Sequence, residues 1–362
     1  MLDTPTLLLD LNQLEKNIQD IIEFSQQHNV QYRPHIKTHK CAEIAKRQMK
    51  AGAIGITTAT VGEAEVMADA GIDNILIAYP IFTEEKLSRV LALLDKVSVI
   101  VTVDSIEQAN KLHEFFTKNE RTLTVWIKVN TGLNRCGVEP EEQVLQLAEH
   151  IQTLSALELT GIFTHAGHSY AATTEEKVRE IAQYEAEAIV ASANLCEENG
   201  IEIPHRSVGS TPTYKVAGAV DGITEVRPGN AVFYDMIQVG LGAATIEQCA
   251  LTVCASVGSI KAGRIIIDAG AKTLNLDRGA HGNENVQGHG YIKEHPELII
   301  ERLSEEHGII ETRYPELVAL GELLTIIPNH ACTVANLFDA YTVIKDGKVV
   351  DHWKVDARGR VD

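Results

Sequence analysis

This sequence lacks the closely spaced cysteine pairs that zinc and redox motifs contain. Its six cysteines are scattered and form no CxxC pair, which is typical of a protein in a reducing compartment without a disulfide framework. Positive charge is scarce as well. With a formal net charge of −18 at pH 7, the chain lacks the clustered Lys and Arg that neutralise phosphates, which argues against nucleic-acid binding. An anionic cofactor is still allowed, because a few backbone N–H groups can hold a phosphate locally.

Long apolar runs are also missing. The longest ones, such as 75–81, are far too short to cross a bilayer. The first six residues contain neither a basic segment nor a sustained apolar run, so they do not have the pattern of a signal peptide. These absences together predict a cytoplasmic protein that does not enter a membrane.

What the sequence does contain is a long alternation of strand-like and helix-like segments. Its length of 362 residues and apolar fraction of 44% predict two domains, or one large barrel with an appendage. The expected strands are 31–37, 54–58, 74–79, 97–103, 122–129, 157–165, 202–208 and 223–227. Amphipathic segments lie between most of them, for example 62–70, 107–118, 141–154 and 174–198, whereas the connection 211–221 is short. Eight such units in a row predict a (β/α)8 barrel of parallel strands covered by helices.

The pattern changes after about residue 240. Runs rich in Val, Ile and Thr follow one another without long helices between them, at 250–259, 264–268, 323–328, 340–345 and 348–354. Asp346-Gly347, between the last two runs, predicts a hairpin. We therefore expect an α/β chain in which a TIM-type (β/α)8 barrel precedes a C-terminal, mostly β domain.

One lysine lies where the first expected strand passes into a helix-forming stretch. Lys37 belongs to the segment Arg33-Pro-His-Ile-Lys-Thr-His-Lys40, and the stretch 41–50 follows at once. An amine at such a junction can point into a shared pocket, and the four cationic neighbours in the segment are expected to lower its pKa until the amine is a nucleophile. The arrangement suits a lysine that forms a Schiff base. Taken alone, the same segment also fits a basic surface patch beside a strand.

Other unusual polar groups fall at the same edge of the expected barrel. In this fold the catalytic residues gather at the C-terminal ends of the strands. Besides Lys37, four segments follow expected strands: 130–137 (NTGLNRCG), 165–170 (HAGHSY), 208–213 (VGSTPT) and 227–230 (RPGN). The agreement of five independent loops indicates a site on this rim.

The last two loops carry groups that bind phosphate. Barrels frequently hold a phosphate with the loops after strands seven and eight, through Gly backbone amides and Ser or Thr hydroxyls. Gly209, Ser210, Thr211, Gly229 and Asn230 supply that chemistry, although each stretch taken singly also fits an ordinary turn. Opposite a Schiff-base lysine, they indicate pyridoxal 5′-phosphate, with the lysine on its aldehyde and the loops on its phosphate.

These motifs resemble those of a known enzyme group. The matching stretches are PHIKTHK, NTGLNRCGV, HAGHSY, SVGSTPT, EVRPGNAVFYD, DAGAKTL, SEEHG and PNHAC, within a likeness that extends from Pro5 to about Asp351. They are similar to the fold-type III, alanine-racemase-like pyridoxal-phosphate enzymes, and within that group to the D-threonine aldolase/D-serine dehydratase family. The resemblance implies a cofactor-binding barrel at 8–240 and a β domain made of 1–7 and 241–362. It also implies an active site between them and a homodimer whose two subunits contribute to each site.

The resemblance also implies roles for single residues. Lys37 matches the Schiff-base lysine, and the five loop residues named above match phosphate contacts. His165 and Tyr170 match residues that line the cofactor and substrate pocket, where we expect them to take part in catalysis. Arg227 matches the arginine that meets the pyridine nitrogen in alanine racemase, and Arg135 is expected near the phenolic side of the cofactor.

His330 and Cys332 are candidate metal ligands just after an apolar strand. On a strand, residues i and i+2 face the same side, so the imidazole and the thiolate are expected to share one ion. An isolated HxC is more often a buried cysteine beside a hydrogen-bonded histidine, but the family resemblance implies a metal pair here, His-x-Cys or His-x-Asp. Imidazole and thiolate favour zinc, with Mn²⁺ as the alternative.

The resemblance implies a lyase for β-hydroxy-D-amino acids. His-x-Cys is typical of the D-serine dehydratases, which form pyruvate and ammonia, and this reaction is our prediction. The alternative is a D-threonine aldolase, which forms glycine and acetaldehyde and tends to have His-x-Asp. A racemase would need a second base on the opposite face, usually a tyrosine from the C-terminal domain of the partner subunit, for which Tyr291, Tyr314 and Tyr341 are candidates. A metal pair has no role in that reaction. A protein that only binds pyridoxal phosphate is a further alternative, although such relatives lack a C-terminal domain.

A polar insertion at 279–308 contains four more histidines, His281, His289, His295 and His307. We expect them to be solvated or to cap loops, with His307 of the SEEHG motif also a candidate for the pocket.

Overall fold

The first half of the chain forms a parallel barrel. The structure is a computed structural model that describes residues 3–278 and 286–362. Its barrel strands are β2 (Gln31–Tyr32), β3 (Ile56–Thr58), β4 (Asn74–Ile77), β5 (Ser98–Val103), β6 (Leu123–Val129), β7 (Leu157–Thr164), β8 (His205–Val208) and β9 (Glu225–Val226). They pair in the order β2-β9-β8-β7-β6-β5-β4-β3. The first and last strands then meet, because Ile54 N donates to Tyr32 O and Thr57 N to Pro34 O, at 2.9 and 2.7 Å. The predicted barrel is confirmed.

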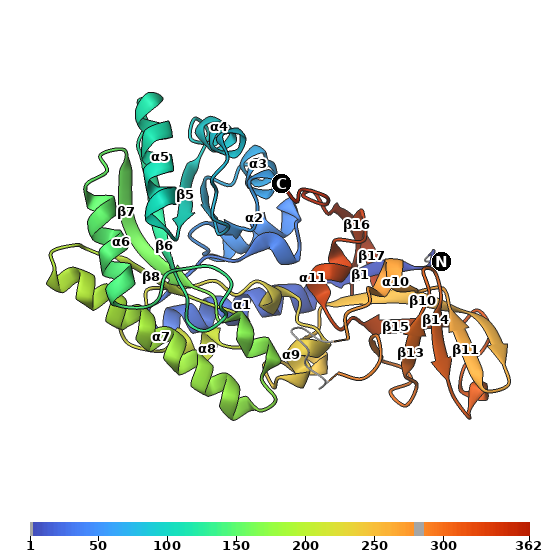
Figure 1. Cartoon of the computed structure of the whole chain (residues 1–362). Helices are drawn as coiled ribbons and strands as arrows, with labels where there is room; N and C mark the ends of the chain where they lie inside the picture. The colour runs from blue at the N-terminus through green and yellow to red at the C-terminus, as the bar shows by residue number, and fades with distance from the viewer. Residues whose placement is uncertain (1–2, 279–285) are drawn as a thin grey trace.

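Helices cover the outside of these strands (Figure 1). They are α1 (Leu11–Gln27), α2 (Ala42–Ala51), α3 (Val61–Asp69), α4 (Glu84–Leu93), α5 (Ile106–Lys118), α6 (Glu142–Gln152), α7 (Glu175–Glu198) and the single turn α8 (Tyr214–Ala217). Several begin at a residue whose side chain accepts a hydrogen bond from the first turn, as Thr60, Ser105 and Thr174 do, which explains why their starts could be predicted. No described helix is long and apolar enough to cross a membrane.

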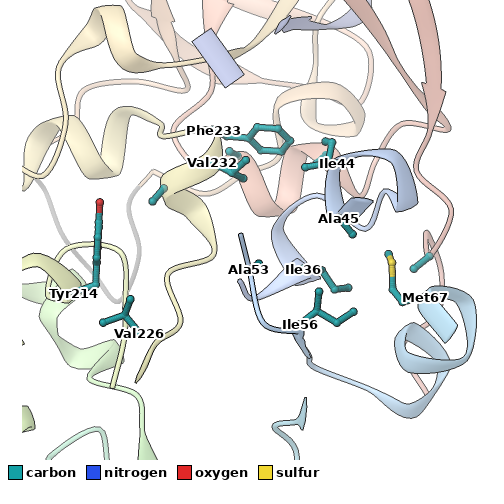
Figure 2. Packing of buried hydrophobic residues seen from close by; sticks show 14 of the residues in the cluster. Ile36, Ile44, Ala45, Ala53, Ile56, Met67, Tyr214, Val226, Val232 and Phe233 are labelled. Atoms are coloured by element: carbon teal, nitrogen blue, oxygen red, sulfur yellow. The ribbon is translucent and has the colours of Figure 1, made fainter. Parts of the chain in front are cut away.

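The barrel strands and helices share one apolar core. Figure 2 shows Ile36, which precedes Lys37 in the chain, beside Ile56 of β3, with Ile44 and Ala45 of α2 nearby. All four side chains are fully buried. The backbone around Lys37 is therefore held in place, because Ile36 before it and α2 after it are packed in the core. The flexible lysine side chain thus extends from a rigid backbone.

The second half of the chain is mostly β. It is built on a sheet of β10 (Leu251–Lys261), β11 (Arg264–Ile267), β12 (Tyr291–Ile292), β13 (Ile300–Leu303), β14 (Gly308–Glu311), β15 (Leu323–Ile327), β16 (Ala340–Lys345) and β17 (Lys348–Lys354). The five runs expected from the sequence are all strands, whereas the short β12, β13 and β14 were not predicted because they lie in or beside the polar insertion. The turn between β16 and β17 has positive φ at both Asp346 and Gly347, as a two-residue hairpin requires.

Both chain ends join the two halves. Strand β1 (Thr6–Asp10) lies between β10 and β16 in the second sheet and continues directly into α1 of the barrel. At the other end, Asp356 accepts a hydrogen bond from Ala42 N at 2.7 Å, and the Asp362 carbonyl accepts one from Gly62 N at 2.9 Å. The β half is thereby held against the barrel beside α2 and α3.

A buried ion pair joins the end of β2 to its neighbouring strand β9. Arg33 Nε lies 2.9 Å from Glu225 Oε2, and the two side chains are 2% and 0% exposed. Glu225 Oε1 also accepts a hydrogen bond from Ser207 at 2.6 Å. The carboxylate is thus a buried charge whose partner is the arginine.

We expect Arg33→Ala to lower the free energy of unfolding by about 3–5 kcal/mol, because it leaves Glu225 buried without its cation. Urea unfolding followed by circular dichroism measures the change. Lys96→Ala, which breaks the exposed pair with Asp69, is the matched control and should leave the midpoint almost unchanged. Equal effects of the two substitutions would contradict the assignment of Arg33 as an essential buried partner.

Candidate active site

A cavity of about 460 Å³ opens at the C-terminal ends of the barrel strands, facing the β half. The residues that the sequence analysis assigned to the cofactor and metal sites all line it, whereas the further candidate His307 does not. They are Lys37, Arg135, His165, Tyr170, Gly209, Ser210, Thr211, Arg227, Gly229, Asn230, His330 and Cys332. They come from the segments after β2, β6, β7, β8 and β9 and from the start of α11 (Ala331–Ala335). The sequence prediction therefore located the cavity, although some of its structural reasons were wrong.

Lys37 lies on a helical turn, not at the end of a strand as expected. β2 ends at Tyr32, and Ile36–Thr38 form a 3-10 turn that His35 caps. Ile36 is completely buried in the core, so its neighbour Lys37 projects from the opposite side of the turn, into the cavity. No hydrogen bond or ion pair joins Lys37 Nζ to any residue in the part of the chain that the structure describes.

Burial lowers the pKa of the Lys37 amine; the nearby charge of Arg135 lowers it further, and Cys332 opposes the shift. The neighbours that the sequence suggested as the cause have other partners. Arg33 pairs with Glu225, and Lys40 pairs with Glu63 at 2.8 Å. His39 is buried with a pKa of about 3 and is therefore uncharged. The Lys37 pKa is lowered, as predicted, but the main cause is the removal of the amine from water and not the charge of its sequence neighbours.

His165 presents one defined ring nitrogen to the cavity. Its Nδ1 lies 2.8 Å from the Gly209 carbonyl oxygen, which can only accept, so Nδ1 is the donor. Burial, followed by the charge of Lys37, holds the pKa of His165 well below its usual value. The ring is therefore neutral and its Nε2 carries a lone pair.

Two loops form a cavity wall with unengaged backbone donors. Among the hydrogen bonds of residues 3–278 and 286–362, none uses the backbone N–H of Ser210, Gly229 or Asn230. Ser210 and Asn230 are only 2% and 4% exposed, and buried donors without partners are uncommon. Free N–H groups on one wall are a common means of binding a phosphate group. The residues present thus fit the phosphate of pyridoxal phosphate.

Two glycines let this wall approach its neighbours. A Cβ on Gly229 would lie 2.9 Å from the His35 carbonyl oxygen, and one on Gly209 would lie 2.8 Å from Arg227 N. Gly209 also has φ +149°, and its N–H donates to Glu185 Oε1 at 3.1 Å. Gly209 therefore shapes the wall without directing a free backbone donor at the cavity, whereas Gly229 brings the loop after β9 against the Lys37 segment.

The other predicted site residues are distributed around the same cavity. Arg227 lies deep in the barrel, where its guanidinium donates to Ser207 and to the Thr164 carbonyl and lies 4.9 Å from the Phe163 ring. Tyr170 follows β7 on a 3-10 turn, Gly167–Ala171, and burial raises its pKa. Arg135 lines the exposed side of the cavity.

His330 and Cys332 do not lie on a strand, which corrects the geometric argument made from the sequence. β15 ends at Ile327, and His330 is the N-cap of the short helix α11 that contains Cys332. The Asp235 carboxylate accepts a hydrogen bond from Ala331 N at 2.8 Å, which starts the helix at this point. Both side chains nevertheless line the cavity, because they lie at a strand-to-helix junction where the chain turns.

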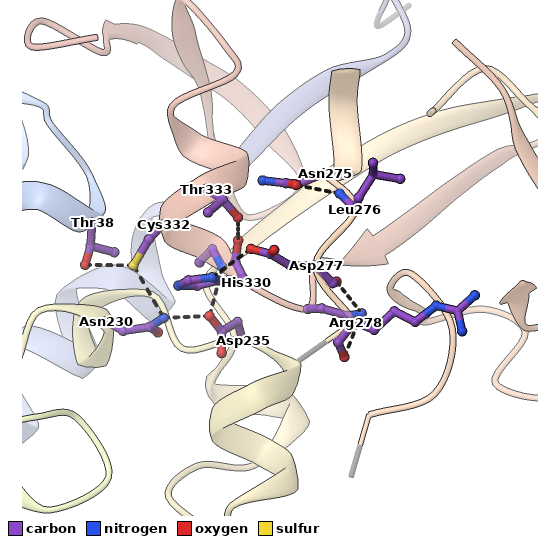
Figure 3. A network of polar contacts seen from close by, with 12 residues as sticks. Thr38, Asn230, Asp235, Asn275, Leu276, Asp277, Arg278, His330, Cys332 and Thr333 are labelled. Carbon is purple, nitrogen blue, oxygen red and sulfur yellow. Dashed lines mark hydrogen bonds and ion pairs between the residues drawn. The ribbon is translucent and has the colours of Figure 1, made fainter. Parts of the chain in front are cut away.

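The His330 and Cys332 side chains have the chemistry of a metal-binding pair. Burial opposes ionisation of Cys332, but the charge and hydrogen bond of His330 outweigh it and lower the pKa of the thiol. Cys332 Sγ lies 3.2 Å from Thr38 Oγ1 in a hydrogen bond that also lowers the pKa of the thiol, and Asn230 Nδ2 donates to Sγ at 3.9 Å (Figure 3). A thiolate beside an imidazole is the donor set that zinc prefers.

Sequence reasoning missed Lys128 and Glu185. Lys128 lies on β6, lines the cavity and donates to the Ala78 carbonyl at 3.1 Å, and burial lowers its pKa. A lysine inside the apolar run 123–129 was the signal that could have identified it. Glu185 on α7 is fully buried and accepts hydrogen bonds from Ala166 N, Gly209 N and Thr213 Oγ1. It holds the loops after β7 and β8 together.

The three histidines of the polar insertion that the structure describes do not line the cavity. His289 is buried, contrary to expectation, because it packs beside Arg278 with an Nε–Nε2 distance of 3.4 Å. His295 pairs with Glu322, and His307 is exposed and does not line the cavity. His281 lies outside the described residues.

A parallel (β/α)8 barrel with a desolvated lysine in one cavity with a wall of unengaged backbone N–H groups, next to a β domain, is typical of the alanine-racemase-like class of pyridoxal-phosphate enzymes. Comparison with known proteins agrees. The sequence model of the alanine racemase N-terminal domain matches residues 9–236, and that of a serine dehydratase domain matches 250–344.

Within that class, the chain belongs to the D-threonine aldolase/D-serine dehydratase family, as its motifs predicted. It is 34% identical to D-threo-3-hydroxyaspartate dehydratase of Delftia sp. (strain HT23), with 98% of this chain and 97% of that protein covered. It is 30% identical to D-threonine aldolase of Arthrobacter sp., covering 99% and 93%. The crystal structure of D-threonine aldolase from Filomicrobium marinum superposes with a TM-score of 0.92 at 31% identity, covering 99% and 96%.

Proposed function

We propose that this protein is a pyridoxal-phosphate- and divalent-metal-dependent lyase of β-hydroxy-D-amino acids, with the dehydration of D-serine as its first expected activity. The observation that carries the proposal is that the candidate Schiff-base lysine and the candidate metal ligands line the same cavity. Cys332 Sγ hydrogen bonds to Thr38, the residue next to Lys37. The residues that would hold the metal therefore lie beside the lysine that would hold the cofactor, in the same cavity.

The residues around Lys37 suit the reaction at Cα. Pyridoxal phosphate, when bound, supplies an aldehyde that links to an amine and a ring that accepts the electron pair released at Cα. Lys37 would hold the cofactor, and its desolvated amine would then take the α-proton. The backbone N–H groups of Ser210, Gly229 and Asn230, with the Thr211 hydroxyl, would hold the phosphate. Arg227 would approach the ring nitrogen, Arg135 the phenolic side, and His165 and Tyr170 the remaining walls.

The metal pair suits the reaction at Cβ. A divalent cation, best Zn²⁺ for these donors, supplies a Lewis acid at a hydroxyl oxygen. His330 and Cys332 would hold it, and two protein ligands leave positions for water and substrate. A relative supports a metal in this family, since one solved cysteine-to-alanine mutant of D-threo-3-hydroxyaspartate dehydratase is described as the metal-free form.

The relatives support both a dehydratase and an aldolase. One at 34% identity is a 3-hydroxyaspartate dehydratase, one at 30% is a D-threonine aldolase, and a D-serine dehydratase of Dictyostelium discoideum is 27% identical over 98% of this chain. Dehydration remains the first choice because of the His-x-Cys pair, and 3-hydroxyaspartate joins D-serine as a candidate substrate. Retro-aldol cleavage of D-threonine is the alternative.

Racemisation has less support. Of the three tyrosines considered as a second base, Tyr341 is fully buried with its hydroxyl donating to the His39 carbonyl at 2.6 Å. Tyr341 is therefore committed to the interior and cannot reach another subunit.

The proposed working form is a cytoplasmic homodimer. Tyr79 lines the cavity yet is 63% exposed, and Phe82 on the same loop is 55% exposed. Large exposed apolar side chains beside a catalytic cavity favour a second protein surface there. All six cysteines are free thiols, as suits a reducing compartment.

An end-product assay separates the candidate reactions. Purified protein loaded with pyridoxal phosphate and zinc is given D-serine, D-threonine or D-threo-3-hydroxyaspartate in parallel. Keto acid and ammonia are the expected products from D-serine. Glycine and acetaldehyde from D-threonine, without keto acid from any substrate, would replace the dehydratase with the aldolase.

A further inference from the structure

We propose that Asp277 is a positioning residue for the metal pair, which orients His330 so that its Nε2 faces the ion. The inference rests on the proposed metal-dependent function and adds to it a residue that no motif singled out. Asp277 follows α10 (Ala271–Leu274), far from His330 in the sequence.

The geometry of the contact fixes which ring nitrogen is free. His330 Nδ1 lies 3.1 Å from Asp277 Oδ2. Because an ionised carboxylate only accepts hydrogen bonds, Nδ1 carries the proton. The remaining nitrogen, Nε2, points away from Asp277 because the two ring nitrogens diverge, and it is the nitrogen that would give up its proton to bind an ion. Histidines that bind metals commonly donate their second N–H to a carboxylate in this way.

The chain holds Asp277 in place through the residue next to His330. Asn329 is 1% exposed, and its side-chain nitrogen donates to the carbonyl oxygens of Asp277, at 3.1 Å, and Gly288, at 2.9 Å. The backbone of Asp277 and the backbone of His330 are thus tied together by one buried amide. In Figure 3, the Asp277 side chain points back toward the His330 ring from this position.

Cys332 is supported by a separate set of residues. Asp235 is fully buried, and its Oδ2 accepts hydrogen bonds from Ala331 N at 2.8 Å and from Asn230 Nδ2 at 2.6 Å. Asn230 and Thr38 in turn contact the Cys332 sulfur. Among the described residues, Asp277 is the one carboxylate that hydrogen bonds to the His330 ring. Its loss should therefore act on the histidine and leave the cysteine side of the pair unchanged.

Asp277 is neither a third ligand nor an important stabiliser of the fold in this arrangement. The described residues contain no cluster of three or more His, Cys, Asp or Glu side chains suited to one ion. The Asp277 side chain is 40% exposed, and pairs of this kind contribute little to stability. Variants at this position should fold, so that a change in metal binding can be read directly.

The test is zinc affinity, measured by competition with a chromophoric chelator on the pyridoxal-phosphate-loaded protein. Asp277→Ala is expected to weaken zinc binding about 10- to 100-fold, with Asp277→Asn between that variant and the unmodified protein because an acceptor is kept. Glu322→Gln is the matched control. Glu322 makes a similar contact with His295, at 3.1 Å in the same β half, and its substitution should leave the affinity unchanged.

His330→Ala separates failure of this inference from failure of the proposed function. If His330→Ala binds zinc as tightly as the unmodified protein, the metal pair itself is wrong. If His330→Ala loses zinc but Asp277→Ala keeps full affinity, the metal pair stands and the positioning role is overturned. A cobalt-substituted Asp277→Ala protein whose d–d spectrum reports one ligand fewer would also overturn it, since Asp277 would then bind the ion directly.

Discussion

Lys37→Ala is expected to lower kcat/KM on a β-hydroxy-D-amino acid by about 10³-fold or more, and to abolish the absorbance band of the lysine-linked cofactor. The substitution removes both the covalent attachment and the amine proposed to take the α-proton, and a positioned base alone contributes about 10²- to 10⁴-fold. Lys37 is suited to both tasks because burial lowers its pKa and no described residue engages its amine.

A second lysine, on the helix that follows Lys37, serves as the control. Lys46 lies on α2 with an exposed side chain, so Lys46→Ala should keep the absorbance band and full activity. Lys37→Arg separates imine formation from positive charge, because a guanidinium keeps the charge but does not form the imine. A Lys37→Ala protein that retained turnover would remove the lysine from the mechanism.

Cys332→Ala is expected to reduce turnover about 10²- to 10³-fold and to lower the zinc content of the purified protein. Lewis-acid assistance at the leaving hydroxyl is worth several kcal/mol, and each tenfold change in rate corresponds to about 1.4 kcal/mol. The substitution also leaves Lys37 and the wall proposed to bind phosphate intact. Cofactor binding should therefore be normal while elimination fails, which distinguishes this variant from Lys37→Ala.

Cys254→Ala is the control for the loss of a thiol. Cys254 is a free, buried cysteine on β10 that does not line the cavity, so its substitution should change neither zinc content nor turnover. If Cys332→Ala kept full zinc and full activity, the ion would have to bind elsewhere, and the dehydratase argument from His-x-Cys would lose its basis.

The barrel could be predicted because its strands are buried on both faces. Parallel strands such as β5 and β6 are nearly continuous apolar runs, and capped amphipathic helices separate them. The positions of the polar loops then follow from chain direction, since all parallel strands end at one rim. That rule alone brought the Lys37 segment together with the loops at 165–170, 208–213 and 227–230.

The errors came from local geometry and from contacts between distant residues. His330 and Cys332 were expected on a strand, but β15 ends just before Pro328. A helix starts there instead, because the Asp235 carboxylate accepts a hydrogen bond from Ala331 N. The ion pairs of Arg33 with Glu225 and of Lys40 with Glu63 could not be predicted, because no periodic pattern in the sequence links the partners. Glu225 lies 192 residues beyond Arg33. The contact between Asp277 and His330 could not be predicted for the same reason, because the two residues are 53 positions apart.

The most direct test of the account is removal of the metal from the pyridoxal-phosphate-loaded protein, with D-serine and D-alanine compared before and after. Absorbance follows binding of each amino acid to the cofactor, and keto acid and ammonia report turnover. The account predicts that both amino acids bind, that only D-serine yields product, and that chelation stops product formation while binding continues until zinc is restored. Undiminished keto acid formation in metal-free protein, or racemisation of D-alanine, would contradict it.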